Sequence, residues 1–203
     1  MELPQELGIA SSADVDERSS IGPGTVVWHL AQVREHARIG VDCVIGRGVY
    51  IGPGVTLGDR CKVQNHALVY EPAVVSDGAF IGPAVVLTND LFPRAVTPDG
   101  QLKEAQDWDL VGVEVREGAS IGARAVCVAP VTIGRWAMVA AGSVVTQDVP
   151  DFALVVGVPA RQVGWVGRAG VRLDQVDEHT FRCPRTGRTY TADHGGLVES
   201  VET

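Results

Sequence analysis

The chain has 203 residues, of which 45% are apolar, and it carries a formal net charge of −8. A chain of this size favours one domain with a substantial core and at most a small appendage. The acidic balance and the absence of a Lys/Arg run argue against a surface that binds nucleic acid or an anionic membrane.

The same composition indicates a cytoplasmic protein with an unusual core. No run of about 18 apolar residues is present, and the N-terminal stretch MELPQELGIA has neither a basic nor an apolar leader segment. The four cysteines lack the spacing of a disulfide framework, which agrees with a reducing compartment. Glycine is plentiful at 24 residues while aromatics make up only 5%, which favours a repetitive, tightly turned structure.

An apolar residue recurs at every sixth position over two blocks of the sequence, and a small or β-branched residue usually follows it four positions later. No helix has this period. Cys43, Cys61 and Cys127 fall on inward positions of the pattern and are interpreted as small core residues rather than ligands or nucleophiles. The apolar positions are Ile9, Val15, Ile21, Val27, Val33, Ile39, Ile45, Ile51, Leu57, Val63, Val69, Val75, Ile81, Leu87, Val115, Ile121, Cys127, Ile133, Val139 and Val145.

This pattern predicts an all-β parallel solenoid. Each hexapeptide forms one short strand and one turn, and three hexapeptides form a triangular coil. The repeats correspond to six to seven coils. Glycine often follows the apolar residue, as at Gly122, where the backbone turns and a side chain would obstruct it. Pro23, Pro53 and Pro83 follow three of these glycines and pre-set φ in the turn.

The count stops at Leu87 and resumes at Val115, and the separation is not a multiple of six. Thr88-Asn89-Asp90 opens the inserted segment, residues 88–114. Loops of this length without secondary structure are usually functional. A solenoid face is flat, so we expect the loop to close a cleft against a neighbouring subunit. A solvent loop or a trimer clasp is the alternative.

Five segments carry a family resemblance: VWHLAQV, CKVQNHALVYEP, IGPAVVLTNDLFPRA, IGARAVCVAPVTIG and VAAGSVVTQDVPDFALVVGVPARQVGW. Together they resemble the left-handed β-helix hexapeptide acyltransferases, closest to the N-acetyltransferases that act on 3-amino sugars carried by UDP or dTDP. The resemblance covers Ile9 to Trp165, and it alone implies the left hand, since parallel crossovers are otherwise right-handed.

The resemblance implies acetyl-CoA as co-substrate and a homotrimer whose active sites lie between adjacent subunits. Residues 139–165 would form the CoA-binding end. Ala140, Ala141 and Gly142 would line the pantetheine arm, while Pro159 and Arg161 of GVPAR would pass the adenosine phosphates. A guanidinium suits that position because CoA is polyanionic and the chain is acidic. An ordinary solvated cation is the alternative for Arg161.

For the acceptor, the resemblance implies that Glu71, Asn89 and Asp90 surround a sugar amine, with Asn65 and Arg94 binding the substrate. Acetyl transfer needs an uncharged nitrogen, an aligned thioester and a stabilised oxyanion. Glu71 precedes Asn89 by eighteen residues, which is one coil, so the two side chains should stack on one edge. Alternatively, Asn89 merely exits the coil, and the two acids are solvated.

His66 is the rival general base, since imidazole has a suitable pKa. It lies in QNH, where the resembling enzymes more often have QNN, and a surface role is the alternative. A different class is a γ-type carbonic anhydrase, which needs three histidines on zinc. His29, His36 and His66 lack a one-coil spacing. A non-catalytic solenoid subunit and another hexapeptide O- or N-acyltransferase remain further alternatives.

The last segment, residues 166–203, follows the predicted β-helix domain of residues 1–165 and no longer shows the six-residue repeat. FRCPRTGRTY resembles the second half of a zinc ribbon. Its ligand positions map to Gly167, Ala169, Cys183 and Thr186, so three of four thiols are missing and no zinc is expected. We predict a small metal-free hairpin there. The function predicted for the whole is acetylation of a nucleotide-linked amino sugar, at C3.

Overall fold

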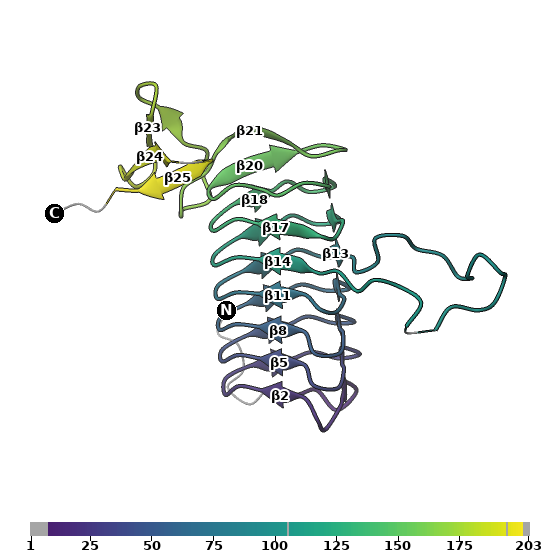
Figure 1. The fold of residues 1–203 in the computed structure, drawn as a ribbon. Coiled ribbons are helices and arrows are strands. Elements are labelled where there is room, and N and C mark those ends of the chain that lie inside the picture. Colours follow the sequence, from purple (N-terminus) through teal and green to yellow (C-terminus); the bar gives the residue numbers. More distant parts are fainter. Residues whose placement is uncertain (1–7, 105, 194, 201–203) are drawn as a thin grey trace.

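The computed structural model describes residues 8–104, 106–193 and 195–200, and the N-terminal leader expectation concerns residues mostly outside this set. The chain folds as a left-handed parallel β-helix, which confirms the predicted fold class (Figure 1). Three sheets form the walls of a triangular prism. The chain visits the first wall, then the second, then the third, and each visit pairs with the visit one coil earlier.

The first wall holds seven strands, the second six and the third eight. The first comprises β1 (Asp14–Val15), β4 (Gln32–Val33), β7 (Tyr50–Ile51), β10 (Leu68–Val69), β13 (Val86–Leu87), β16 (Val126–Cys127) and β19 (Val144–Val145). The second comprises β2 (Ser20–Ile21), β5 (Arg38–Ile39), β8 (Thr56–Leu57), β11 (Val74–Val75), β14 (Val113–Val115) and β17 (Val131–Ile133). The third comprises β3 (Val26–Val27), β6 (Val44–Ile45), β9 (Lys62–Val63), β12 (Phe80–Ile81), β15 (Ser120–Ile121), β18 (Met138–Val139), β20 (Ala153–Val156) and β21 (Arg161–Trp165).

The predicted six to seven coils match the first two walls. The third wall is longer because β20 and β21 extend it past the last hexapeptide. Three corners join the walls. Corner 1 follows the first wall and includes residues 70–73 and 88–90. Corner 2 follows the second wall and includes residues 58–61 and 76–79. Corner 3 follows the third wall and includes residues 64–67 and 140–143.

The core is the interior of the prism, where the two repeating positions alternate. The apolar position, such as Ile45, and the small position, such as Ala67, are both fully buried. Cys43, Cys61 and Cys127 are buried inward residues, as predicted. Glycine is required where coils approach closely. A Cβ at Gly122 would lie 2.5 Å from the backbone nitrogen of Ala141 in the next coil.

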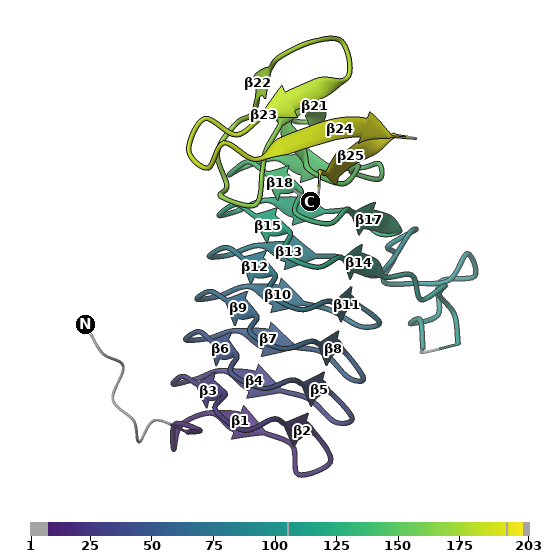
Figure 2. The ribbon, with the colours of Figure 1, turned by 90° about the vertical axis from the view of Figure 1, so that its left-hand side faces the viewer.

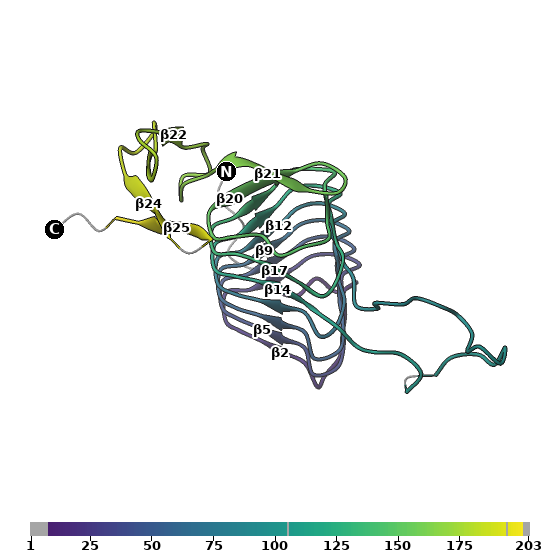
Figure 3. The same cartoon turned by 45° about the horizontal axis from the view of Figure 1, so that its top comes forward.

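The insertion leaves the prism between β13 and β14 and projects away from it (Figures 1 and 3). Its two ends meet at the wall. The Val111 N–H donates to the Asn89 carbonyl at 3.2 Å, and Asp90 forms an antiparallel bridge with Leu110. β14 begins at Val113, slightly inside the predicted insertion of residues 88–114, because the strand adds one inward valine to its hexapeptide.

The C-terminal segment is larger than the predicted hairpin. It forms a four-stranded antiparallel sheet of β22 (Asp174–Gln175), β23 (Thr180–Arg182), β24 (Thr189–Asp193) and β25 (Gly196–Glu199). Figure 2 shows this sheet at the C-terminal end of the stack. Cys183 and Tyr190 are buried in its own core, together with Phe152 from the last coil. The Arg168 guanidinium lies 4.5 Å from the Trp136 ring centroid and fastens the sheet to the prism.

No helix is found among the described residues, and hence none that is long and apolar enough to cross a membrane.

Candidate active site

A cavity of about 510 Å³ opens at corner 1, between the prism and the base of the insertion. Four residues predicted for the acceptor side line it together: Glu71, Asn89, Asp90 and Arg94. The interruption of the repeat therefore does form a concave site. The full lining is Tyr70, Glu71, Asn89, Asp90, Arg94, Ala95, Leu102, Lys103, Glu104 and Trp108.

Glu71 and Asn89 stack at this corner, as their spacing predicted. Val69 in β10 pairs in register with Leu87 in β13, and each site residue follows its strand by two positions. Parallel strands are about 4.8 Å apart, so the two side chains belong to successive coils at one edge. The side-chain amide of Asn89 has no hydrogen bond to another described residue and is available at the cavity.

The local roles of Asp90 and Arg94 are also visible. Asp90 Oδ1 accepts a hydrogen bond from the Phe92 N–H at 2.8 Å, which is the bond that starts an Asx turn into the insertion. Arg94 is exposed, and its Nη1 donates to the Pro93 carbonyl at 3.0 Å. Both residues shape the start of the loop, and both still face the cavity.

Glu71 is the unusual acid of the cavity. Its Oε2 is buried and has no hydrogen-bond partner among the described residues. Two tyrosines, Tyr50 and Tyr70, lie beside it with ring centroids 5.1 Å apart. Burial and the negative charge of Glu71 raise the pKa of Tyr50. The Glu71 carboxylate is thus held in a partly apolar setting without a compensating donor.

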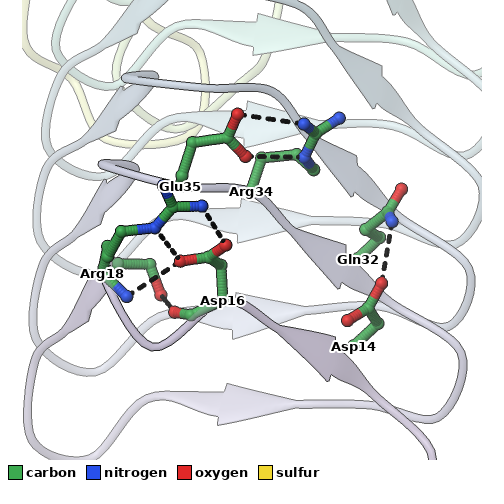
Figure 4. Close-up of polar contacts among 7 residues, drawn as sticks. Asp14, Asp16, Arg18, Gln32, Arg34 and Glu35 are labelled. Carbon is green, nitrogen blue, oxygen red and sulfur yellow. Dashed lines mark hydrogen bonds and ion pairs between the residues drawn. The ribbon is translucent and has the colours of Figure 1, made fainter.

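Carboxylates lower on the same edge have cationic partners (Figure 4). Asp16 pairs with Arg18 at 2.7 Å, and Glu35 pairs with Arg34 at 2.8 Å. The hydrogen bonds from these guanidinium groups lower the pKa of Asp16 and of Glu35. Glu71 differs from these two in facing the cavity without such a partner.

Sequence reasoning missed the other cavity residues. Tyr70 directly precedes Glu71 in VYEP, and its position one residue before a candidate acid was an available signal. Lys103, Glu104 and Trp108 come from the far half of the insertion, which has no period. Their return to the prism depends on the closing contacts of the loop, which no local pattern specifies.

His66 and Asn65 lie away from this cavity, at corner 3. They precede β10 whereas Glu71 follows it, so the strand separates them. Asn65 Oδ1 accepts the Arg47 N–H at 2.9 Å and so caps the turn of the coil below. His66 is exposed and has a φ of +61°, a left-handed conformation that turn residues adopt.

The residues predicted for the CoA end also lie at or beside corner 3. Ala140, Ala141 and Gly142 form the turn between β18 and β19. The neighbouring turn carries Pro159, and Arg161 begins β21 directly after it; both residues are exposed. The two turns are bonded to each other. The Gly157 N–H donates to Ser143 Oγ at 3.1 Å, and the Ala160 N–H donates to the Val144 carbonyl at 2.8 Å.

The acceptor cavity and the predicted CoA-binding end therefore lie at different corners of one protomer, corner 1 and corner 3. Register places His66, Ala84, Arg124 and Gly142 in one column along corner 3, with one coil between neighbours. Three coil spacings are about 14 Å. His29 also lies at corner 3 while His36 lies at corner 1, and no three His, Cys, Asp or Glu side chains of the described residues are grouped to hold a metal ion.

Comparison with known proteins confirms the resemblance to hexapeptide transferases. Residues 36–71 match the family described as bacterial transferase hexapeptide (six repeats). Residues 112–147 match the hexapeptide repeat of succinyl-transferase. These matches lie on either side of the insertion and cover parts of the two repeat blocks.

The individual sequence relatives include an amino-sugar N-acetyltransferase. The chain is 46% identical over 87 residues to dTDP-3-amino-3,6-dideoxy-alpha-D-galactopyranose 3-N-acetyltransferase of Aneurinibacillus thermoaerophilus. That match covers 43% of this chain and 44% of the relative, and the match to the bifunctional protein GlmU of Thermotoga maritima covers 12% of that relative. The chain thus spans less than half the length of these curated relatives.

Solved structures share the fold. One is a variant of GDP-perosamine N-acetyl transferase from Caulobacter crescentus in complex with CoA and GDP-perosamine. It has a TM-score of 0.54 and 26% identity, over 78% of this chain and 57% of that chain. Another is a variant of the N-acyltransferase AntD from Bacillus cereus, with a TM-score of 0.62 and 21% identity over 73% of this chain and 83% of that one. The second likeness bears on the fold alone.

Proposed function

We propose that this protein transfers the acetyl group of acetyl-CoA to the amino group of a nucleotide-linked amino sugar, at C3. The observation that carries the proposal is the cavity at corner 1. It gathers Glu71, Asn89, Asp90 and Arg94 at the break in the repeat. The relative from Aneurinibacillus thermoaerophilus, an N-acetyltransferase of a dTDP-3-amino sugar, supports this substrate class.

The chemistry assigned to the cavity residues follows from their charges. A sugar amine is mostly protonated at neutral pH, so one proton must leave before the nitrogen can attack. Glu71 and Asp90 supply negative charge that holds the ammonium, and Oε2 of Glu71 has no hydrogen-bond partner in the described part of the chain. The Asn89 amide hydrogen-bonds the amine or the oxyanion that develops on the thioester carbonyl.

The bond changes balance without a further reactant. The neutral nitrogen attacks the carbonyl carbon, a C–N bond forms, and collapse of the tetrahedral intermediate breaks the C–S bond. The departing CoA thiolate takes the second proton of the nitrogen and leaves as a thiol. In the proposed mechanism Glu71 takes the first proton. The rival assignment gives that role to His66.

We propose a homotrimer whose protomers share each active site, and the positions of the CoA end and of the acceptor cavity support this proposal. The CoA end lies at corner 3, and the acceptor cavity lies at corner 1 of the same protomer. A pantetheine arm that runs down corner 3 from Gly142 for about 14 Å reaches the level of His66 and of β10. Glu71 follows β10, so both ends meet at one height if corner 3 of one protomer faces corner 1 of the next.

The loop itself supports such an assembly. Phe92 is 68% exposed and Leu102 is 77% exposed on the projecting insertion. Apolar side chains on an extended loop are stabilised when a neighbouring surface covers them. Arg94, at the mouth of the cavity, is assigned to a phosphate or a carboxylate of the nucleotide sugar.

The test is release of the CoA thiol, followed with a thiol reagent in steady state. Acetyl-CoA is supplied with a dTDP-3-amino-3,6-dideoxyhexose or with a UDP-3-amino-glucuronate, in parallel. We expect turnover with one of these acceptors and not without acceptor. If acetyl-CoA binds but neither sugar stimulates thiol release, the 3-amino-sugar assignment is wrong, and hydroxyl acceptors with His66 as base become the next hypothesis.

A further inference from the structure

The corners of the prism use one recurring hydrogen bond. A side-chain oxygen on one coil accepts the backbone N–H of the residue eighteen positions earlier, one coil below. Asp59 accepts from Val41, Asn65 from Arg47 and Asp77 from Asp59, each at 2.9 Å. In each case the oxygen lies against the glycine that precedes the donor residue. This bond satisfies a backbone donor at the turn and fixes the acid or amide above it.

Glu71 occupies the same place at corner 1, but its donor is missing. Its Oε2 lies against Gly52, where a Cβ would collide with it. Gly52 is followed by Pro53, which lies eighteen positions before Glu71. Because Ile51 pairs in register with Val69, Pro53 occupies the position directly below Glu71, one coil earlier. Proline has no backbone N–H. The absent donor explains why this buried oxygen has no hydrogen-bond partner.

An unpaired buried carboxylate oxygen is costly, because it has lost its water without gaining a donor. Such groups in native structures call for an explanation, and a catalytic role is one of them. Glu71 also lines the cavity assigned to the acceptor amine, whereas Asp16 and Glu35 on the same edge are neutralised by arginines. The free-energy cost of an unpaired carboxylate oxygen is therefore found at Glu71, the acid that lines the proposed acceptor site.

We propose that Pro53 is a positioning residue for the acceptor site. By withholding the backbone hydrogen bond that Asp59, Asn65 and Asp77 receive, it leaves Oε2 of Glu71 without a hydrogen bond from the described residues. The substrate ammonium then becomes the partner of this carboxylate, and the carboxylate keeps its capacity to accept the ammonium proton. This inference rests on the proposed function, since it assigns the partner of Glu71 in that reaction.

The chain contains a matched control. Pro23 also follows a glycine at a corner, but the residue one coil above it is Val41, as the pairing of Ile21 with Ile39 shows. Replacing Pro23 by alanine adds a backbone N–H at a position whose counterpart one coil above is a valine, so the recurring hydrogen bond cannot form there. The substitutions Pro53→Ala and Pro23→Ala release the same restriction on φ. The difference to be tested between them is therefore the acceptor one coil above, which is present for position 53 and missing for position 23.

The experiment compares the wild type, Pro53→Ala and Pro23→Ala in the thiol-release assay with the accepted amino sugar. A hydrogen bond to a charged group contributes about 1.5–3 kcal/mol, so we expect Pro53→Ala to lower kcat/KM for the sugar by about tenfold or more. The KM for acetyl-CoA should stay unchanged. Pro23→Ala should remain within about twofold of the wild type in both.

Two further readouts separate this role from a structural one. In a Glu71→Gln background, which itself is expected to be slow, Pro53→Ala should cause no further loss of kcat/KM, because the two substitutions act through one carboxylate. The new backbone amide at position 53 should exchange its hydrogen slowly in Pro53→Ala, while the new amide at position 23 in Pro23→Ala should exchange faster.

Equal kinetics for Pro53→Ala and Pro23→Ala, an unprotected amide at position 53, or a full additional loss in the Glu71→Gln background would each overturn the inference. These results would leave the proposed function intact, since the wild type still acetylates the sugar. A wild type that does not turn over any amino sugar would instead overturn the proposed function, and with it the role given to Pro53.

Discussion

Asn89 lies directly above Glu71 at corner 1, one coil apart, and both side chains line the same cavity. The in-register strands β10 and β13 fix this relationship, and the projecting insertion begins at the next residues. A rigid wall therefore presents two polar groups of different chemistry, a carboxylate and an amide, to one small volume. This arrangement suits a site that must hold an ammonium and then an oxyanion.

Replacing Asn89 by alanine should strongly lower the rate of acetyl transfer with little effect on the fold. The side-chain amide makes no hydrogen bond to other described residues, so its removal leaves the wall intact, while loss of one oxyanion or amine contact costs about 100-fold or more in kcat. Steady-state thiol release measures this loss, and binding of acetyl-CoA by calorimetry serves as the control. Retention of wild-type kcat would remove Asn89 from the mechanism.

His66→Asn should keep most of the activity. His66 is exposed in a left-handed turn, and asparagine tolerates this conformation better than other non-glycine residues. We expect kcat within about threefold of the wild type and an unchanged pH profile. If the variant instead loses several orders of magnitude and its pH dependence disappears, His66 is the general base and Glu71 is not.

Mixed assemblies should test the shared site. Asn89→Ala damages corner 1, and Arg161→Glu damages the CoA end at corner 3. Each variant alone should be weak. Co-expressed and co-purified with two different tags, the mixture should regain activity, because some sites combine an intact corner 1 from one protomer with an intact corner 3 from another. No recovery in the mixed species would indicate that each protomer carries its own complete site.

Much of the fold could be predicted from the sequence because the repeat determines it directly. Most inward positions, including Cys43 and Cys61, follow from the six-residue count, and so does the stacking of Glu71 and Asn89. The count fails at Ile9, which is exposed at the start of the prism, and it does not give the added inward Val113. The four-stranded C-terminal sheet could not be predicted, because its core depends on contacts between residues far apart in the sequence. One example is Phe152 and Tyr190, whose ring centroids are 5.2 Å apart. The missing hydrogen-bond donor at Pro53 could not be predicted either, because it depends on which backbone N–H lies beneath each side-chain oxygen in neighbouring coils.

Gly122→Ala should destabilise the prism. The added Cβ would lie 2.5 Å from the Ala141 nitrogen, and that atom belongs to the backbone of the next coil and cannot move aside. Overpacking of this kind costs about 1–3 kcal/mol. Gly8→Ala is the matched control, since nothing lies within 4 Å of the corresponding Cβ. Chemical denaturation measures both, and equal stability of the two variants would contradict the close packing of coils.

The four cysteines should not react with thiol reagents in the native protein. All four are buried, and burial raises the pKa of Cys127 to about 12. Hydrogen bonding with Cys61 lowers the pKa of Cys43 to about 7, so it is burial that keeps this thiol from reacting. Only a thiolate that is accessible reacts with a disulfide reagent. We expect no reaction before unfolding and reaction of four thiols in denaturant, so the enzyme adds no background to the CoA assay. Rapid labelling of the folded protein would show that the prism opens.

The most direct test of the account is the chemical identity of the product. Wild-type protein is incubated with acetyl-CoA and a dTDP-3-amino-3,6-dideoxyhexose, and the nucleotide sugar is analysed by mass spectrometry before and after hydroxylamine treatment. An N-acetyl transfer gives a sugar that has gained one acetyl group, in equal amount to the CoA released, and the amide survives hydroxylamine. An acetyl group that hydroxylamine removes, or CoA release without an acetylated sugar, would contradict the proposed function.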